Sequence, residues 1–283
     1  MIRFAELVNP EYSIYKRTGL KEGMPIANQT AAARIVADMI QDGYYIDFVE
    51  TLIRIDREGY MGHQYNFLGL NNVAASLIQD GFSFDNVSGQ FFENQDEHIS
   101  VNWGRLQEEE ERNMAVLRLD IAGNSELVRN NPRPVIERAY KDIRNIFHSS
   151  VISRLGRLWS WEGDGALAAF LYGQKEKMAI YAGMDTIHEL FFYNRIRNPL
   201  SSPINIRLGA HTGIVRYSQK EINRLKNETV KQAVSLESLA PNNALCVSYN
   251  LYLSMDQGTL DLFCAEKNKK GLKYRYYCMG TEK

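Results

Sequence analysis

Residues 119–125 read Leu-Asp-Ile-Ala-Gly-Asn-Ser, and this stretch decides the fold expected for the second half of the chain. It is an apolar run that ends on the carboxylate of Asp120 and turns through Gly123 into a predicted helix. A carboxylate in that place can hold a hard cation, and free backbone N–H groups at a helix start can meet phosphate oxygens. The stretch therefore predicts a phosphate-metal site, although an ordinary turn capped by Ser125 fits it too.

A second carboxylate follows at the tip of a predicted hairpin. Leu158–Trp161 and Ala166–Leu171 read as strands, and the Glu-Gly-Asp-Gly sequence between them has the composition of a turn. Asp164 would be presented at the tip of this turn. An Asp-Gly pair is usually only a turn, so Asp164 alone is weak evidence for a functional site. It indicates such a site only together with Asp120.

From Met114 onward the pattern alternates apolar strands with amphipathic helices, which is typical of a mixed α+β domain. The expected strands are residues 115–119, 158–161, 166–171, 204–208, 260–265 and 273–278. The expected helices are residues 135–152, 175–194 and 229–239. The last two strands would form a hairpin around residues 268–271 and close the fold.

Residues 1–100 follow helical spacing instead, and we predict a small all-α helical domain there. Its helices are expected at 31–42, 46–57 and 71–80, each followed by a glycine suited to a C-terminal cap. Regulation, binding of a protein partner and support of a dimer all fit such a domain. Residues 101–113 read as a polar linker, whose acidic run Glu108–Glu111 we interpret as a solvated helix face.

The composition narrows the class of protein. The 283 residues carry 33 basic and 34 acidic side chains, and this balance gives no reason to expect nucleic-acid binding. No apolar run approaches the roughly 20 residues that span a bilayer, and the N-terminus lacks a signal-peptide layout. We therefore expect a soluble, cytoplasmic protein. Three scattered cysteines and five scattered histidines predict neither disulfides nor a zinc site.

The order of these segments resembles the class III adenylyl/guanylyl cyclase family. Residues 120–125 resemble its Asp-Ile-x-Gly-Phe-Thr segment, and residues 154–170 resemble its hairpin with the second metal aspartate. Residues 206–213, Ile-Arg-Leu-Gly-Ala-His-Thr-Gly, are similar to its Arg-Ile-Gly-Ile-His-Thr-Gly strand. Leu236–Ala240, Val247-Ser248 and Lys270-Gly271 follow in the expected order. The resemblance spans roughly residues 112–279, and residues 1–100 match nothing comparable.

The resemblance implies that residues 114–283 form an α+β, ferredoxin-like cyclase domain. Such domains work as head-to-tail homodimers with sites between the subunits. The implied substrate is a nucleoside triphosphate, whose ribose 3′-hydroxyl attacks the α-phosphate so that pyrophosphate leaves. The implied cofactors are two divalent metal ions, Mg²⁺ or Mn²⁺, which suit this displacement.

Matched by residue, the resemblance assigns both metals to Asp120 and Asp164, with the Ile121 carbonyl as a further ligand. The groups assigned to the phosphates are Gly123, Asn124, Ser125, Arg207 and Lys270. The two cations among them would act as fixed positive charges on the triphosphate. Read from its strand alone, Arg207 fits equally well as the partner of a surface carboxylate.

Base recognition departs from the family pattern. Ser160 stands where the family carries an adenine-selecting lysine, and it lies between Trp159 and Trp161. Arg224 stands where an aspartate is expected. Either tryptophan would stack on a base, although core packing is the ordinary duty of a tryptophan.

The transition-state asparagine and arginine of the third helix correspond to Lys231 and Ser235. Three interpretations follow. The enzyme cyclises another base, as do the bacterial pyrimidine cyclases of antiphage signalling, with Lys231 or Arg224 supplying the missing charge. Alternatively it is an adenylate cyclase with shifted specificity residues, or a degenerate domain that dimerises and signals without turnover. We favour a cyclase, and UTP or CTP over ATP.

Overall fold

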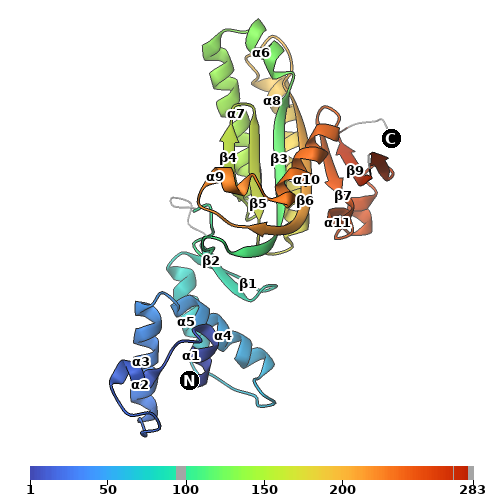
Figure 1. Cartoon of the computed structure of the whole chain (residues 1–283). Coiled ribbons are helices and arrows are strands. Elements are labelled where there is room, and N and C mark those ends of the chain that lie inside the picture. Colours follow the sequence, from blue (N-terminus) through green and yellow to red (C-terminus); the bar gives the residue numbers. More distant parts are fainter. Residues whose placement is uncertain (94–99, 270, 280–283) are drawn as a thin grey trace. The chain divides into compact units, whose positions relative to one another are not determined.

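The computed structural model describes residues 1–93, 100–269 and 271–279 (Figure 1). The chain divides into two compact units, Met1–Ile99 and Ser100–Lys283. Across the described residues, no helix combines the length and the apolar character that crossing a bilayer requires.

The first unit is built around helices that bury one apolar face each. Its elements are α1 (Ile2–Val8), α2 (Ile14–Thr18), α3 (Asn28–Gln41), α4 (Tyr45–Glu58), α5 (Leu70–Gln79), β1 (Phe82–Asp85) and β2 (Gln90–Glu93). Ile35, Met39, Phe48 and Ile55 form the centre of its core. The ring of Phe4 meets three aromatic rings of the segment after α4 edge-on, those of Tyr60, Tyr65 and Phe67.

The prediction of an all-α first unit is wrong, because β1 and β2 pair as an antiparallel hairpin. Phe82 and Phe84 alternate with polar residues along β1, whereas β2 carries Phe91 and Phe92 in succession. Phe84 packs on Phe91 with ring centroids 4.7 Å apart. Asp85 organises the turn, since its carboxylate accepts the backbone N–H groups of Val87 and Ser88. The helical pattern ends before this turn, since α5 stops at Gln79 and Gly81 with φ +95° leads into β1.

The second unit contains one seven-stranded sheet in the order β4-β5-β3-β6-β7-β9-β8. The strands are β3 (Glu111–Ala122), β4 (Arg157–Glu162), β5 (Gly165–Phe170), β6 (Asn205–Arg216), β7 (Ala244–Ser248), β8 (Lys267–Lys269) and β9 (Leu272–Cys278). The helices are α6 (Asn124–Asn130), α7 (Arg133–Ile152), α8 (Lys175–Ile196), α9 (Glu221–Arg224), α10 (Glu228–Leu239), α11 (Tyr249–Tyr252) and α12 (Gln257–Leu260). Neighbouring strands run antiparallel except β6 and β7, which are parallel. The prediction of a mixed α+β domain is confirmed.

The two faces of this sheet have different environments. Leu117, Leu119 and Ile121 of β3 point into the main core with Ile143 and Phe147 of α7 and with the apolar face of α8. The alternate residues of β3 therefore point to the opposite face. Helix α10 packs on that face, against β6 and β3 (Figure 1). A polar site can form there without breaking the main core.

Helix α10 approaches β6 so closely that residue 209 has no room for a side chain. A Cβ added at Gly209 would lie 2.2 Å from the carbonyl oxygen of Ala233 and from the backbone nitrogen of Glu237. Since Arg207 precedes Gly209 by two residues, it shares the face that meets α10. The close packing thus sets Glu237 of the helix beside Arg207 of the strand.

Two local predictions in this unit are wrong. Residues 260–265 do not form a strand, because Asp256 caps the short helix α12 by accepting the backbone N–H of Thr259 at 3.0 Å. The acidic run Glu108–Glu111 is not a helix face either. The carboxylate of Glu108 accepts the hydroxyl of Ser218 and the backbone N–H of Gln219, so the run ties the start of β3 to the segment after β6.

Candidate active site

Asp120 and Asp164 lie close together at one end of the β3–β5 strand pair. Asp120 lies opposite Gly165 in the antiparallel ladder, so the hairpin tip at Asp164 comes next to the end of β3. The backbone N–H of Ile121 donates to the carbonyl of Asp164 at 3.0 Å, which fixes the hairpin against the strand. The Ile121 side chain is buried in the main core. Two carboxylates predicted from separate motifs are thus neighbours.

Asn124 connects the two loops that carry these aspartates. Its side-chain amide donates to Oδ2 of Asp164 at 2.6 Å, and its amide oxygen accepts the hydroxyl of Tyr140 from α7. Burial, followed by the charge of Asp164, raises the pKa of Tyr140. Gly123 just before α6 has φ +70°, a backbone conformation that glycine adopts without strain. Asn124 therefore orients an aspartate in addition to its predicted phosphate role.

Arg207 lies between two carboxylates. It stands opposite Asp120 in the β3–β6 ladder and its Nη2 is 2.5 Å from Oδ2 of Asp120. On its other side, Nε is 3.1 Å from Oε1 of Glu237, which is 5% exposed. The hydrogen bond to Asp120 raises the pKa of Arg207. Burial, reinforced by the charge of Asp120, raises the pKa of Glu237.

The sequence did not point to Glu237 or to Arg118 as site residues. Arg118 precedes Asp120 by two residues on β3, so both side chains emerge on the same face. The positive charges of Arg207 and Arg118 oppose the rise in the pKa of Glu237. The spacing Arg-x-Asp at the end of a strand would have been the one signal for Arg118.

The donor set suits metal ions that arrive with a phosphate ligand. The described residues contain no group of three or more His, Cys, Asp or Glu side chains that could hold an ion. Asp120 and Asp164 offer two carboxylates, and Mg²⁺ is typically bound by one or two carboxylates together with water and substrate phosphates. The pair therefore fits a metal–triphosphate complex better than a permanent, fully protein-ligated ion.

Two residues predicted on the third helix of the site lie away from the two aspartates. Lys231 and Ser235 are on the exposed face of α10, where Lys231 Nζ is 3.4 Å from the carboxylate of Glu228. Glu237 occupies the opposite, buried face of the same helix. A single copy of the chain thus does not bring Lys231 to the two aspartates. Lys270 lies outside the described residues.

The residues predicted to read the base are together but engaged in packing. Arg224, 4% exposed, donates to the carbonyl oxygens of Ser218 and Gln219 and, at 2.9 Å, to that of Trp159. Ser160 follows Trp159 in β4 and is buried as well. Trp159 packs against the rings of Trp103 and Tyr217. Its surroundings match the core-packing interpretation.

Trp161 has the same kind of surroundings. Its ring lies 6.3 Å from that of Phe147, and it packs against the main core. Both tryptophan rings therefore contact other aromatic rings in this arrangement.

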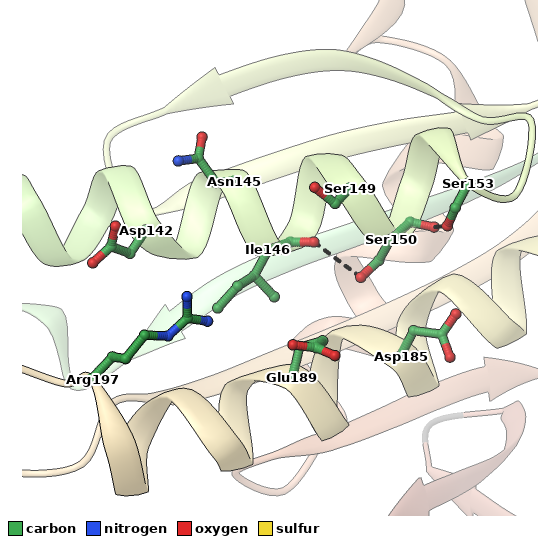
Figure 2. Close-up of a pocket in the computed structure, with 9 residues that line it drawn as sticks. All are labelled: Asp142, Asn145, Ile146, Ser149, Ser150, Ser153, Asp185, Glu189 and Arg197. Atoms are coloured by element: carbon green, nitrogen blue, oxygen red, sulfur yellow. Dashed lines mark hydrogen bonds between the residues drawn. The ribbon is translucent and has the colours of Figure 1, made fainter.

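A separate cavity of about 470 Å³ lies between α7 and α8 (Figure 2). Most of the lining residues are polar, and three of them are acidic: Asp142, Asn145, Ile146, Ser149, Ser150, Ser153, Asp185, Glu189 and Arg197. Asp120 and Asp164 do not line it, so it is distinct from the site on the sheet.

No protein-family model matches this chain, and no curated protein matches it either. Several solved structures do match this chain. The guanylate cyclase domain of RhGC from Catenaria anguillulae, solved in complex with GTP, has a TM-score of 0.52 at 16% identity and covers 61% of this chain and 100% of its own.

Two further structures agree. The guanylyl cyclase domain of the RhoGC fusion protein from Blastocladiella emersonii has a TM-score of 0.51 at 16% identity, covering 60% of this chain and 97% of that one. The adenylyl cyclase CyaB from P. aeruginosa has a TM-score of 0.51 at 16% identity, covering 61% and 96%. The chain therefore carries the fold of the class III adenylyl and guanylyl cyclase catalytic domains.

Proposed function

We propose that the second unit is a metal-dependent nucleotidyl cyclase, which converts a nucleoside triphosphate to a 3′,5′-cyclic nucleotide and pyrophosphate. One observation carries the proposal. Asp120 at the end of β3 and Asp164 at the hairpin tip are neighbours on the polar face of a cyclase fold. Two adjacent carboxylates at such a place suit the binding of a metal–triphosphate complex.

The side chains around the pair have distinct duties in this proposal. Asp120 and Asp164 hold the divalent ions, and the Ile121 carbonyl is a further ligand. Two ions held there lower the pKa of the attacking 3′-hydroxyl and neutralise the leaving group. Asn124 fixes the orientation of the Asp164 carboxylate through the hydrogen bond at 2.6 Å. Arg207, whose guanidinium lies beside Asp120, would contact the triphosphate as a fixed cation.

The remaining phosphate contacts come from backbone groups and from a second cation. The N–H groups of Gly123, Asn124 and Ser125 lie at the start of α6, where the first amides have no partner within the helix. Lys270 is the second predicted cation. A homodimer completes the site in this proposal, because Lys231 projects from the exposed face of α10 and would act on the partner's aspartates.

The base is proposed to be a pyrimidine, with UTP or CTP as substrate and a role in antiphage signalling. The argument rests on Ser160 and Arg224, which replace the lysine and aspartate that select adenine in the family. Arg224 donates to three backbone carbonyls, so it fixes the segment after β6 against β4 instead of reading a base edge. An adenylate cyclase is the alternative, and cAMP as the sole product would establish it.

The test is turnover by the full-length protein. Purified protein is incubated with Mn²⁺ and each of ATP, GTP, CTP and UTP, and products are identified by mass spectrometry. We expect one cyclic nucleotide, lost in Asp164→Asn and retained in Glu162→Gln. Glu162 is the matched control, because it is an exposed carboxylate of the same hairpin.

Absence of product from all four nucleotides, with the protein folded and dimeric, would favour the non-enzymatic signalling module. Binding then separates the alternatives. An enzyme awaiting an activator is stabilised by Mn²⁺ with a non-hydrolysable triphosphate, and Asp120→Ala abolishes that stabilisation. A pure dimerisation module responds to neither.

A further inference from the structure

Arg118 is a cation of the polar face that the proposed mechanism has not used. In the sheet it lies between Gly209 of β6 and Leu167 of β5, two pairs away from Asp120 in both ladders. Its side chain is half-buried. A guanidinium that loses much of its hydration in this way ordinarily gains a carboxylate, a phosphate or a carbonyl in exchange.

The guanidinium of Arg118 rests on the glycine that follows Asp164. A Cβ added at Gly165 would lie 2.2 Å from Nη2 and 2.9 Å from Cζ of Arg118. Gly165 has no positive φ, so the turn does not require glycine at this position. The space that glycine leaves is filled by the arginine head group. Gly165 therefore seats Arg118 directly beside the two aspartates.

The donors of Arg118 are unused among the described residues. The side chain of Arg118 makes no hydrogen bond or ion pair there, and its buried Nε has no partner. Arg207, by contrast, contacts Asp120 and Glu237. Arg118 is close enough for its charge to oppose the rise in the pKa of Glu237, yet it closes no ion pair with it. The site thus holds a seated guanidinium with free N–H donors.

We propose that Arg118 is a further phosphate-binding residue of this site, and that Gly165 is there to seat it. The inference rests on the proposed function and deepens it. A planar guanidinium with free donors suits the paired oxygens of a phosphate better than a single point charge does. Because Ser235 brings no charge to the third helix, Arg118 provides a second fixed guanidinium beside Arg207.

Binding of inorganic tripolyphosphate in the presence of Mn²⁺, measured by isothermal titration calorimetry, tests the role without requiring turnover. Arg118→Met removes the donors while keeping most of the apolar volume. We expect the dissociation constant to rise about 10- to 100-fold, as the loss of a charge-assisted hydrogen bond implies. Arg118→Lys should recover part of the affinity. Arg112→Met is the control, since Arg112 is an exposed arginine at the far end of β3.

Gly165→Ala is a second, independent variant that keeps the charge but displaces the guanidinium. We expect it to weaken tripolyphosphate binding less than Arg118→Met does, and to add little once Arg118 is already replaced. Circular dichroism of each variant verifies that the fold is retained. Tripolyphosphate binding by Arg118→Met within twofold of the original protein would overturn the role of Arg118, and so would an original protein that binds none.

Turnover separates this inference from the proposed function. If the original protein makes a cyclic nucleotide and Arg118→Met keeps the same kcat and KM, the cyclase stands and the role of Arg118 fails. If the original protein binds tripolyphosphate through Arg118 but cyclises none of the four nucleotides, and Asp120→Ala leaves its stabilisation by Mn²⁺ with a non-hydrolysable triphosphate unchanged, the phosphate-binding role stands and the cyclase proposal fails.

Discussion

Arg207 lies directly opposite Asp120 in the β3–β6 ladder, and its Nη2 is 2.5 Å from Oδ2 of that aspartate. The same guanidinium is the positive neighbour of the buried Glu237. One arginine therefore balances two carboxylates that belong to different elements. Removing it should matter for stability as well as for phosphate binding.

We expect Arg207→Ala to lower the free energy of unfolding by about 1–3 kcal/mol, because it leaves a buried carboxylate without a partner. All three tryptophans, Trp103, Trp159 and Trp161, lie in the second unit, so urea unfolding followed by tryptophan fluorescence reports on that unit. The double variant Arg207→Ala/Glu237→Gln should be more stable than Arg207→Ala alone. Equal losses in the single and double variants would mean that the ion pair contributes nothing.

The raised pKa of Glu237 predicts a specific pH dependence. Burial makes folded Glu237 hold its proton more tightly than unfolded Glu237, so its contribution to stability falls as pH rises from 4.5 through the raised folded pKa. Glu237→Gln removes this group. The unfolding free energy of the variant minus that of the original protein should therefore increase with pH across this window, then level off.

Urea titrations at a series of pH values measure that difference. The groups that face Glu237 remain in both proteins, namely Asp120, Asp164, Arg118 and Arg207, so most other titrations cancel. A difference that decreases with pH would mean that pairing with Arg207 outweighs burial.

Asn124 should control metal affinity through Asp164. Asn124→Ala removes the donor 2.6 Å from Oδ2 of Asp164, and loss of such an orienting partner typically costs about 10- to 100-fold in metal affinity. Calorimetric titration of Mn²⁺ in the presence of tripolyphosphate measures the effect. Tyr140→Phe is the graded comparison, since it removes only the hydroxyl that orients Asn124 and should cost less. Unchanged affinity in Asn124→Ala would show that Asp164 needs no orienting bond.

The two aspartates of the proposed metal site could be predicted from the sequence, because the patterns that mark them are local. Asp120 ends an apolar run before a glycine, and Asp164 sits in a Gly-Asp-Gly turn, so a few neighbouring residues define each position. Glu237 had no such signal, and Arg118 had only its Arg-x-Asp spacing at the end of β3. Their duties depend on which strand pairs with which, and on how closely α10 packs at Gly209. Both features depend on residues far apart in the sequence, so a short stretch of sequence does not reveal them.

The same distinction between local sequence patterns and long-range packing explains the wrong predictions of secondary structure. Residues 260–265 carry apolar side chains at strand-like spacing, but Asp256, four residues earlier, caps a helix that includes Leu260. In the first unit, Ile-Gln-Asp-Gly occurs twice and ends a helix each time. Tyr44 then leads into α4, whereas Phe82 begins β1. The repeated motif therefore fixes the end of a helix and leaves the next element to tertiary packing.

Gly209 tests whether the closeness of α10 to β6 is needed for the site. In Gly209→Ala the new methyl group would lie 2.2 Å from backbone atoms of α10, and backbone cannot move aside as a side-chain tip can. We expect a loss of about 1–3 kcal/mol in the free energy of unfolding, the usual cost of overpacking. Gly258→Ala is the matched control, because its added Cβ has only an ordinary contact, at 3.4 Å from a carboxylate oxygen of Asp256. Because the clash pushes α10 off the sheet and so reduces the burial that raises the pKa of Glu237, Gly209→Ala should also flatten the pH dependence assigned to Glu237. Loss of stability without that change would mean that Glu237 titrates independently of the helix position.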